Sequence, residues 1–470
     1  MQIYAQLVYQ STLCLSFAEN RNVRYYHLIA LGGSVMHNLA IDLKDAGHRV
    51  TGSDDEIYEP SRSRLSEYGL LPSEMGWHPS RISEDIDVII LGKHAKSDNP
   101  ELLKAIELGL PIMSFPEFVA LHSKAQKKIA ITGSHGKTTT TSMVMHVLKQ
   151  EGLDFDYLVG AQIQGFQKMV RISGAPILIV EGDEYPSSCL DNRAKMLHYK
   201  ADVSVITGVA WDHVNIYKTY ADYLGIFENY LKQSPEGSKI FFDQTDENLT
   251  QLILADAYQA TRKGYIALKT NRKGAIVYDE VAYPIQVFGE HNLKNLHAAL
   301  LVCQELDISA ERFLQQIGSF TGAAKRLELL HKTEDRVIYK DFAHAPSKAK
   351  ATAEAVRSKY KHKKIKAVME LHTFSSLSKD FIPHYEGTLD SLDKVAVFYD
   401  PAAMKLKRMP DLDKTMIADA FAHPQLQVLS SLEELEAYLK ADMDDYQVYL
   451  IMSSGNLGGL SPLDILKGNE

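Results

Sequence analysis

The residues with the clearest chemical pattern are Gly133, Gly136, Lys137 and Thr138, which follow the apolar segment Lys128–Thr132. Glycines at a strand-to-helix turn let backbone N–H groups face an anion, and the following helix adds the positive end of its dipole. The lysine would reach the outer phosphates of a nucleoside triphosphate, and the threonine hydroxyl would help to hold Mg²⁺. The pattern therefore predicts a triphosphate site. Its other loop residues are Ser134, His135 and Thr139.

The glycine spacing departs from the commonest phosphate-loop pattern. The sequence G-x-x-x-x-G-K would need a glycine where this chain has Ile131, so the motif here is the shorter G-x-x-G-K-T. A strand-to-helix turn that merely carries a lysine is the alternative interpretation. The apolar strand before the turn and the helical pattern after it favour the nucleotide site.

Two later apolar segments, 177–180 and 203–207, also run into polar side chains. These are Glu181, Asp183, Glu184, Asp212 and His213. Because the carboxyl ends of parallel strands share one edge of a sheet, we expect them beside the phosphate loop. Carboxylates and an imidazole at that place suit Mg²⁺ binding and charge neutralisation. Taken singly, each is also typical of a solvated loop.

Three later clusters carry side chains suited to ATP. The first opens a helix and contributes His291, Asn292 and Asn295, which suit the edges of adenine, with helix capping as the alternative for Asn292. Arg326 offers a guanidinium to a phosphate, or it belongs to an exposed basic pair. Asp341 ends an apolar segment and suits ribose hydroxyls or a solvated turn equally.

The elements that must position these residues follow a regular order. From Tyr25 onward, short β-branched or apolar segments alternate with helical patterns, which is typical of parallel α/β architecture. A length of 470 residues, at roughly 150 per domain, indicates about three domains. We expect an N-terminal extension (1–24) and domains at 25–123, 124–322 and 323–470. Within the second domain, residues 235–285 suggest a local antiparallel insertion, with strands at 239–242, 265–268, 275–278 and 285–288.

Composition limits the class of protein. The net charge of −9 argues against a protein that coats nucleic acid, which would have a basic excess. The three cysteines, Cys14, Cys189 and Cys303, are far apart and odd in number, so we expect no disulfide framework and a cytoplasmic protein. No apolar run approaches the roughly 20 residues of a membrane helix. For residues 1–24 a loose extension or an upstream start codon is favoured over a signal peptide.

Taken together, the motifs resemble the Mur ligase family of ATP-dependent, amide-forming enzymes of peptidoglycan assembly. They are TGSHGKTTT, EGDEY, WDH, GEHNLKN, KRLE and DFAHAP, in this order, and the resemblance covers nearly all of the chain after Tyr25. It implies a Rossmann-like UDP-binding domain, a central ATP-binding domain with a parallel sheet and a small antiparallel insertion, and a Rossmann-like C-terminal domain. The last would bind the amine substrate and complete the ATP site.

The resemblance also implies a reaction. ATP would phosphorylate the lactyl carboxylate of UDP-N-acetylmuramate, and an amine would attack the acyl phosphate. Segments such as Lys195–Tyr199 (KMLHY) and Ile451–Gly459 (IMSSGNLGG) resemble the recycling branch, whose amine is the tripeptide L-Ala-γ-D-Glu-meso-diaminopimelate. The branch that adds L-alanine is the alternative. Two further classes are a P-loop ATPase or binding protein without ligase activity, and a nucleotide dehydrogenase. The last is weakened because the first turn lacks G-x-G-x-x-G.

Residue roles follow from the same resemblance. Lys137 and Arg326 would balance the charge of the phosphoryl group, Thr138 and Glu181 would hold one Mg²⁺, and His213 would frame a second metal. The nucleoside would contact His291, Asn292, Asn295 and Asp341. The UDP moiety would contact Gly32, Gly33, Ser34, Met36 and Asp54.

Three expectations about this site stay open on the sequence. Asp54 ends a second strand, where an acidic residue commonly binds a ribose, and a turn cap is its alternative. His344 and His372 would face the amine substrate or lie in solvated loops. Where several members carry a carbamylated lysine, this chain has Phe227, so none is expected. We expect a monomer or weak homo-oligomer with no nucleic-acid or membrane partner.

Overall fold

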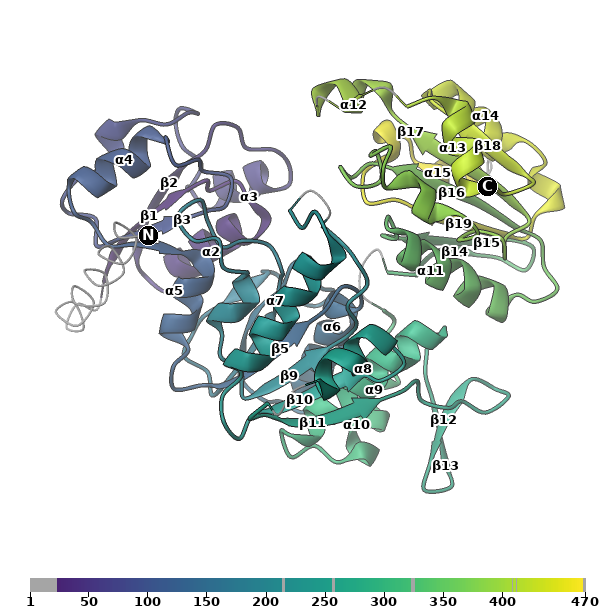
Figure 1. Ribbon diagram of the computed structural model, residues 1–470, viewed down its shortest axis with the longest axis horizontal. Helices are drawn as coiled ribbons and strands as arrows, with labels where there is room; N and C mark the ends of the chain where they lie inside the picture. Colours follow the sequence, from purple (N-terminus) through teal and green to yellow (C-terminus); the bar gives the residue numbers. More distant parts are fainter. Residues whose placement is uncertain are drawn as a thin grey trace.

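Three helix-covered sheets follow one another along the described part of the chain, and a separate two-stranded sheet lies between the second and third in sequence (Figure 1). The structure is a computed structural model that describes residues 23–213, 216–255, 258–322, 326–407, 409–410 and 412–467. Residues 1–22 of the expected extension therefore lie outside the described residues. The expected boundary at 322–323 adjoins residues 323–325, which are also outside them. Among the helices that are described, none is long and apolar enough to cross a membrane.

The first unit is a four-stranded parallel sheet in the order β2-β1-β3-β4. Its strands are β1 (Tyr25–Ile29), β2 (Arg49–Ser53), β3 (Val88–Leu91) and β4 (Ile112–Ser114). Its helices are α2 (Ser34–Asp45), α3 (Ser61–Glu67), α4 (Pro100–Glu107) and α5 (Phe115–His122), with a 3-10 turn η1 (Pro79–Arg81). Strands β1 and β3 are buried along their whole length, as expected for parallel strands covered on both faces.

The central unit is a seven-stranded sheet in the order β11-β10-β9-β5-β8-β6-β7, in which only β7 is antiparallel to its neighbour. Its strands are β5 (Lys127–Thr132), β6 (Phe155–Leu158), β7 (Val170–Arg171), β8 (Ile177–Glu181), β9 (Val203–Ile206), β10 (Lys239–Asp243) and β11 (Thr261–Tyr265). Its helices are α6 (Lys137–Gln150), η2 (Lys195–His198), α7 (Tyr220–Gln233), α8 (Glu247–Leu254), α9 (Glu290–Gln304) and α10 (Ala310–Ile317).

The expected antiparallel insertion over 235–285 is wrong in extent. Strands β10 and β11 pair in parallel and extend the central sheet, because the unpredicted helix α8 supplies the crossover that parallel neighbours need. Only β12 (Ala275–Tyr278) and β13 (Val281–Pro284) pair antiparallel, as a hairpin that projects from the body in Figure 1. No strand forms at the expected 285–288.

The third unit is a six-stranded sheet in the order β14-β15-β19-β16-β17-β18, parallel except for the edge strand β14. Its strands are β14 (Glu328–Lys332), β15 (Val337–Asp341), β16 (Ile365–Leu371), β17 (Lys394–Tyr399), β18 (Leu426–Leu429) and β19 (Val448–Met452). Its helices are α11 (Pro346–Lys359), η3 (Ile382–Tyr385), α12 (Pro401–Leu406), α13 (Lys414–Phe421), α14 (Leu432–Lys440), η4 (Met443–Asp445), η5 (Leu457–Gly459) and α15 (Pro462–Lys467).

The arrangement of the units brings strand ends from all three toward one region. In Figure 1 the first unit (purple to blue) and the third unit (green to yellow) lie on either side of the space above the central one. The third unit contacts the central unit through α11, which touches α9 and the loop after β5, and through aromatic rings of β15 and η3 that lie near Phe288 and Trp211. The chemistry-bearing residues are therefore carried by loops at the carboxyl ends of strands, where parallel sheets bind ligands.

Candidate functional site

The phosphate loop connects β5 to α6 and requires glycine at two positions. Gly133 and Gly136 have φ values of 109° and 87°, which L side chains rarely adopt. A Cβ atom on Gly133 would lie 2.5 Å from the Thr207 hydroxyl oxygen, and one on Gly136 would lie 2.3 Å from the Asn295 side-chain oxygen. The loop is thus held closely between the end of β9 and the first turns of α9.

Lys137 points back over this loop. Its ammonium donates to both carboxylate oxygens of Glu184, each at 2.9 Å, and also to the Gly133 carbonyl. Glu184 is fully buried. Burial lowers the pKa of Lys137, but the carboxylates of Glu184 and Asp183 outweigh it and raise that pKa above its ordinary value. The loop therefore holds a charged cation that can exchange its carboxylate partner for a phosphate.

Thr138 and Glu181 meet directly beside Lys137. The Thr138 hydroxyl donates to Glu181 Oε2 at 3.1 Å, and the other carboxylate oxygen, Oε1, is buried and has no hydrogen-bond partner in the part of the chain that the structure describes. Burial raises the pKa of Glu181. An unpartnered buried carboxylate oxygen next to a hydroxyl is a donor set that fits a hard cation such as Mg²⁺.

His213 lies at the next strand end, on the other side of Glu184. Its Nε2 is 3.7 Å from Glu184 Oε2, and its ring is 4.3 Å from the Tyr185 ring. Ligand atoms of Asp183, Glu184 and His213 all lie within 4.8 Å of one another, so they could share an ion. Asp183 and Glu184 were recognised in the sequence as part of a strand end, but their contacts with Lys195 and Lys137 were not predicted.

The third unit reaches the loop through the start of α11. His135 Nε2 lies 2.5 Å from Ser347 Oγ, and the Lys348 ammonium lies 3.0 Å from Asp212 Oδ2. Lys348 was missed by the sequence analysis. The signal that could have found it is its place in the first turn of the helix that follows the DFAHAP motif.

Arg326 and Asp341 lie close together at the carboxyl end of β15. Asp341 is buried and accepts hydrogen bonds from the backbone N–H groups of Leu327 (2.6 Å) and Ala343 (2.7 Å). Burial raises the pKa of Asp341, against the opposing effect of the Arg326 guanidinium. Asp341 therefore fixes the chain that carries Arg326, whose guanidinium lies over the Phe342 ring at 4.9 Å.

Three of the four residues predicted for the nucleoside, His291, Asn292 and Asn295, lie at the start of α9, whereas Asp341 belongs to β15. Asn292 donates from Nδ2 to the Phe288 carbonyl at 2.9 Å, and it does not cap the helix, because the N-cap residue of α9 is Gly289. Asn295 faces Gly136, as described above. Burial lowers the pKa of His291 to about 4, so its ring is neutral at pH 7 and can accept as well as donate a hydrogen bond.

One cavity of about 880 Å³ joins these groups. The predicted site residues that line it are Ser34, Ser134, His135, Gly136, Lys137, Thr138, Thr139, Glu181, His213, His291, Asn292, Asn295, Arg326, Asp341 and His344. Those outside its lining are Gly32, Gly33, Met36, Asp54, Gly133 and His372. His372 lies at the carboxyl end of β16, where its Nδ1 is 3.8 Å from Glu370 Oε1.

The predicted UDP residues form the turn before α2. Asp54 is buried and accepts hydrogen bonds from the Gly32 and Asp55 backbone N–H groups at 2.6 and 3.0 Å, which is the geometry of its turn-cap alternative. Burial raises its pKa to about 6. Two residues that were not predicted, His37 and Arg64, line the cavity on this side. Arg64 also donates to the Gln167 carbonyl of the central unit at 2.9 Å.

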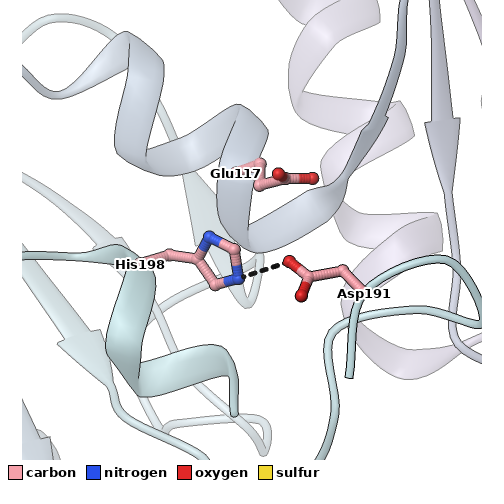
Figure 2. Close-up of side chains that lie close together, drawn as sticks. All are labelled: Glu117, Asp191 and His198. Atoms are coloured by element: carbon pink, nitrogen blue, oxygen red, sulfur yellow. Dashed lines mark ion pairs between the residues drawn. The ribbon is translucent and has the colours of Figure 1, made fainter. Parts of the chain in front are cut away.

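A second cluster, of Glu117, Asp191 and His198, joins the first and central units (Figure 2). His198 Nε2 lies 3.2 Å from Asp191 Oδ2, the pair marked in the figure. The guanidinium of Arg193 binds Asp191 at 2.7 Å and Glu117 at 3.3 Å. Because the arginine already supplies the positive charge that a metal would bring, we interpret the cluster as an ion-pair clamp between α5 and the chain before η2.

Comparisons with family models and with individual known proteins agree on one family. The model described as "Mur ligase family, catalytic domain" matches residues 25–127, and the "Mur ligase middle domain" matches residues 131–303. The UDP-N-acetylmuramate–L-alanine ligase of Lactiplantibacillus plantarum is 31% identical over 387 residues, which cover 79% of this chain and 83% of that protein. The UDP-N-acetylmuramate–L-alanyl-gamma-D-glutamyl-meso-2,6-diaminoheptandioate ligase of Haemophilus influenzae is 26% identical over 465 residues, covering 95% and 100%.

Solved structures show the same fold. A murein peptide ligase from Psychrobacter arcticus matches with a TM-score of 0.66 and 21% identity, over 95% of this chain and 99% of that one. The UDP-N-acetylmuramate-alanine ligase MurC from Thermotoga maritima matches with a TM-score of 0.68 and 19% identity, over 94% and 98%. The three-unit α/β architecture is thus confirmed as that of these ligases.

Proposed function

We propose, from the premise that this chain belongs to the Mur ligase family of ATP-dependent amide-bond ligases, that it acts on UDP-N-acetylmuramate. It would join the lactyl carboxylate to the L-Ala amine of L-Ala-γ-D-Glu-meso-diaminopimelate. The observation that carries the proposal is the single cavity lined by all three units, with Ser34 from the first, Lys137 from the second and Arg326 from the third. A reaction of a nucleotide sugar, ATP and an amine needs such a meeting point.

The phosphate loop supplies the charge stabilisation that phosphoryl transfer needs. Lys137 would leave Glu184 and bind the outer phosphates of ATP, while the backbone N–H groups of the loop bind the others. Thr138 and Glu181 would hold Mg²⁺, which when bound neutralises part of the phosphate charge. Arg326 would stabilise the transferring phosphoryl group from the opposite side of the cavity.

The acyl phosphate formed in this way reacts with water as well as with an amine. The units therefore have to exclude water while they hold both substrates. The contacts of Ser347 and Lys348 with His135 and Asp212 close the cavity on the side of the third unit. His344 lines the cavity on that side and would face the incoming amine, and its pKa is lowered to about 3 by burial, so the ring would not repel a protonated amine.

The choice of amine rests on narrower support. The relative from Haemophilus influenzae is named for the tripeptide, and the segments Lys195–Tyr199 and Ile451–Gly459 resemble that branch. The relative from Lactiplantibacillus plantarum is named for L-alanine, and L-alanine is therefore the second candidate amine. The domain limits, the cytoplasmic location and the monomeric or weakly associated state stay predictions.

The experiment is phosphate release from ATP in the presence of Mg²⁺ and UDP-N-acetylmuramate, with L-alanine or the tripeptide as the amine. If the tripeptide is the amine substrate, phosphate release should depend on the sugar nucleotide and should be much faster with the tripeptide than with L-alanine. Faster release with L-alanine would transfer the protein to the alanine-adding branch. Release without any amine would indicate an ATPase. The Lys137→Ala variant controls for contaminating ATPase, because it removes the loop cation.

A further inference from the structure

Two lysines from different units approach the same aromatic ring near the cavity. Lys93 follows β3 of the first unit, and its ammonium lies 4.6 Å from the centre of the Tyr185 ring. Lys195 begins η2 of the central unit, and its ammonium lies 5.8 Å from the same ring centre and 5.3 Å from that of Phe115. A ring face attracts a cation but does not cancel its charge.

Around the Tyr185 ring the two lysines carry more positive charge than the one carboxylate that pairs with them, Asp183, can balance. Lys195 pairs with Asp183 at 2.6 Å. Lys93 forms no ion pair with any carboxylate of the described residues and is half-buried. Burial and the neighbouring Lys195 lower the pKa of Lys93 to about 8, against the opposing effect of Asp183. A half-buried cation without a carboxylate partner is costly in an unliganded protein, so the pair of lysines is suited to an anion supplied by a ligand.

The chain is built to hold Lys195 in this position. The backbone N–H of Lys195 donates to the Tyr185 carbonyl at 3.0 Å, which fixes the lysine beside the ring. The preceding turn is anchored by Arg193, which binds Asp191 and Glu117 in the clamp of Figure 2. The clamp therefore joins the two units where Lys93 and Lys195 face each other, and the lysine pair depends on how these units are docked.

The position of the two lysines relative to the phosphate loop indicates which anion they would bind. Lys195 and Asp183 line the cavity, and Lys93, which does not line it, lies close enough to feel the charges of both. Asp183 also feels the charge of Lys137. Tyr199, one helical turn beyond Lys195, also lines the cavity, and its buried hydroxyl has no hydrogen-bond partner among the described residues. An anionic group held here lies between the first unit and the loop that presents the γ-phosphate.

We propose that Lys93 and Lys195 form a carboxylate subsite that receives the lactyl carboxylate of the sugar nucleotide before its phosphorylation, with the Tyr199 hydroxyl as a further donor. This inference rests on the proposed function, because it assumes UDP-N-acetylmuramate as substrate. Binding the carboxylate between two cations holds it in its ionised, nucleophilic form and orients it toward the γ-phosphate. The same chemistry would also suit the diphosphate of the nucleotide, and the test separates these two anions.

The test measures binding without ATP by calorimetry, using two ligands that differ at the acceptor. UDP-N-acetylmuramate carries the lactyl carboxylate, and UDP-N-acetylglucosamine lacks it. The unaltered protein should bind the first ligand more tightly. In Lys93→Met and Lys195→Met the affinity for UDP-N-acetylmuramate should fall about 10- to 100-fold, the size expected for losing hydrogen bonds to a charged group, with UDP-N-acetylglucosamine unchanged. Lys96→Met, an exposed lysine of the same loop, should change neither.

Other outcomes have distinct meanings. An equal loss for both ligands would assign the lysines to the diphosphate and overturn the carboxylate subsite, as would no loss for either. If the unaltered protein itself does not prefer UDP-N-acetylmuramate, the substrate assignment fails first, independently of the lysines. Thermal unfolding of each variant shows whether it folds. Lys195→Arg, which keeps the charge, should retain most of the preference and so separates charge from packing.

Discussion

The ammonium of Lys348 lies 3.0 Å from the carboxylate of Asp212, although Lys348 belongs to α11 of the third unit and Asp212 to the loop after β9 of the central unit. Both side chains are largely buried, with exposed fractions of 16% and 9%. Burial alone would raise the pKa of Asp212, but Lys348 and the neighbouring histidines hold it well below its ordinary value. Because Asp212 directly precedes His213, this ion pair connects the third unit to the rim that we propose binds metal and phosphate.

Removing the Lys348 ammonium should therefore impair catalysis. Lys348→Met leaves Asp212 as a buried, unpaired carboxylate, a change that costs about 3–5 kcal/mol in comparable pairs. Since the pair joins the third unit, which carries Arg326, to the rim beside the loop, we expect kcat to fall about 10- to 100-fold, with a smaller change in the KM for ATP. The measurement is steady-state phosphate release. Lys350→Met, an exposed lysine on the same helix, is the matched control, and equal effects of the two variants would contradict this role.

The contact between Thr138 and Glu181 predicts a specific metal dependence. Thr138→Val removes the hydroxyl and keeps the shape, so the Mg²⁺ concentration for half-maximal activity should rise about 10-fold or more. Thr138→Ser keeps the hydroxyl and should stay close to the unaltered protein. A Mg²⁺ titration of phosphate release at saturating ATP distinguishes the two variants. An unchanged Mg²⁺ requirement in Thr138→Val would remove Thr138 from the metal site.

Gly136 offers a test of the close approach between the loop and α9. A Cβ atom there would lie 2.3 Å from the Asn295 side-chain oxygen, at a φ of 87°. Gly152 has a similar φ of 72°, at the end of α6, but a Cβ atom there meets nothing within 4 Å. Both alanine variants should lose about 1 kcal/mol of stability from backbone strain. Only Gly136→Ala should also weaken ATP binding, by about 10-fold or more, as measured by calorimetry.

The phosphate loop was predictable because its signal is local. An apolar strand, two glycines, a lysine and a helical pattern are adjacent in sequence, and the structure has β5, which begins one residue before the expected segment, then the loop and α6. The same holds for the strand ends at Glu181 and His213. By contrast, Lys348 and Lys93 act through partners in another unit, so no local pattern distinguishes them from surface lysines.

The error at 235–285 has a different cause. The segment 239–242 was recognised as a strand, but the eight-residue helix α8 was missed, and without a crossover the strands seemed to be antiparallel neighbours. A signal was present in Asp246, which caps α8 by accepting a hydrogen bond from the Leu249 N–H at 3.0 Å. The interpretation of Asp54 stayed open on the sequence because one carboxylate can both cap a turn and bind a ligand.

The carboxylate subsite predicts how substrate binding varies with pH. The pKa of Lys93 is lowered to about 8 in the free protein, and a bound carboxylate would raise it because it favours the charged form. The complex then binds more protons than the free protein above pH 8, so affinity is highest below that pH and falls as the pH rises. Between pH 7 and pH 9 the Kd of UDP-N-acetylmuramate should increase about 10-fold.

Other charged groups near this ring have to be separated from Lys93. Those facing Lys93 or Tyr185 are Lys195, Asp183 and His213. Asp183, whose pKa is lowered to about 2, keeps its charge across this pH range. Calorimetric titrations with UDP-N-acetylglucosamine report any effect of pH on the UDP part, and Lys93→Met should remove the difference between the two ligands' pH profiles. A profile that persists in Lys93→Met would assign the titrating group to another residue of the subsite.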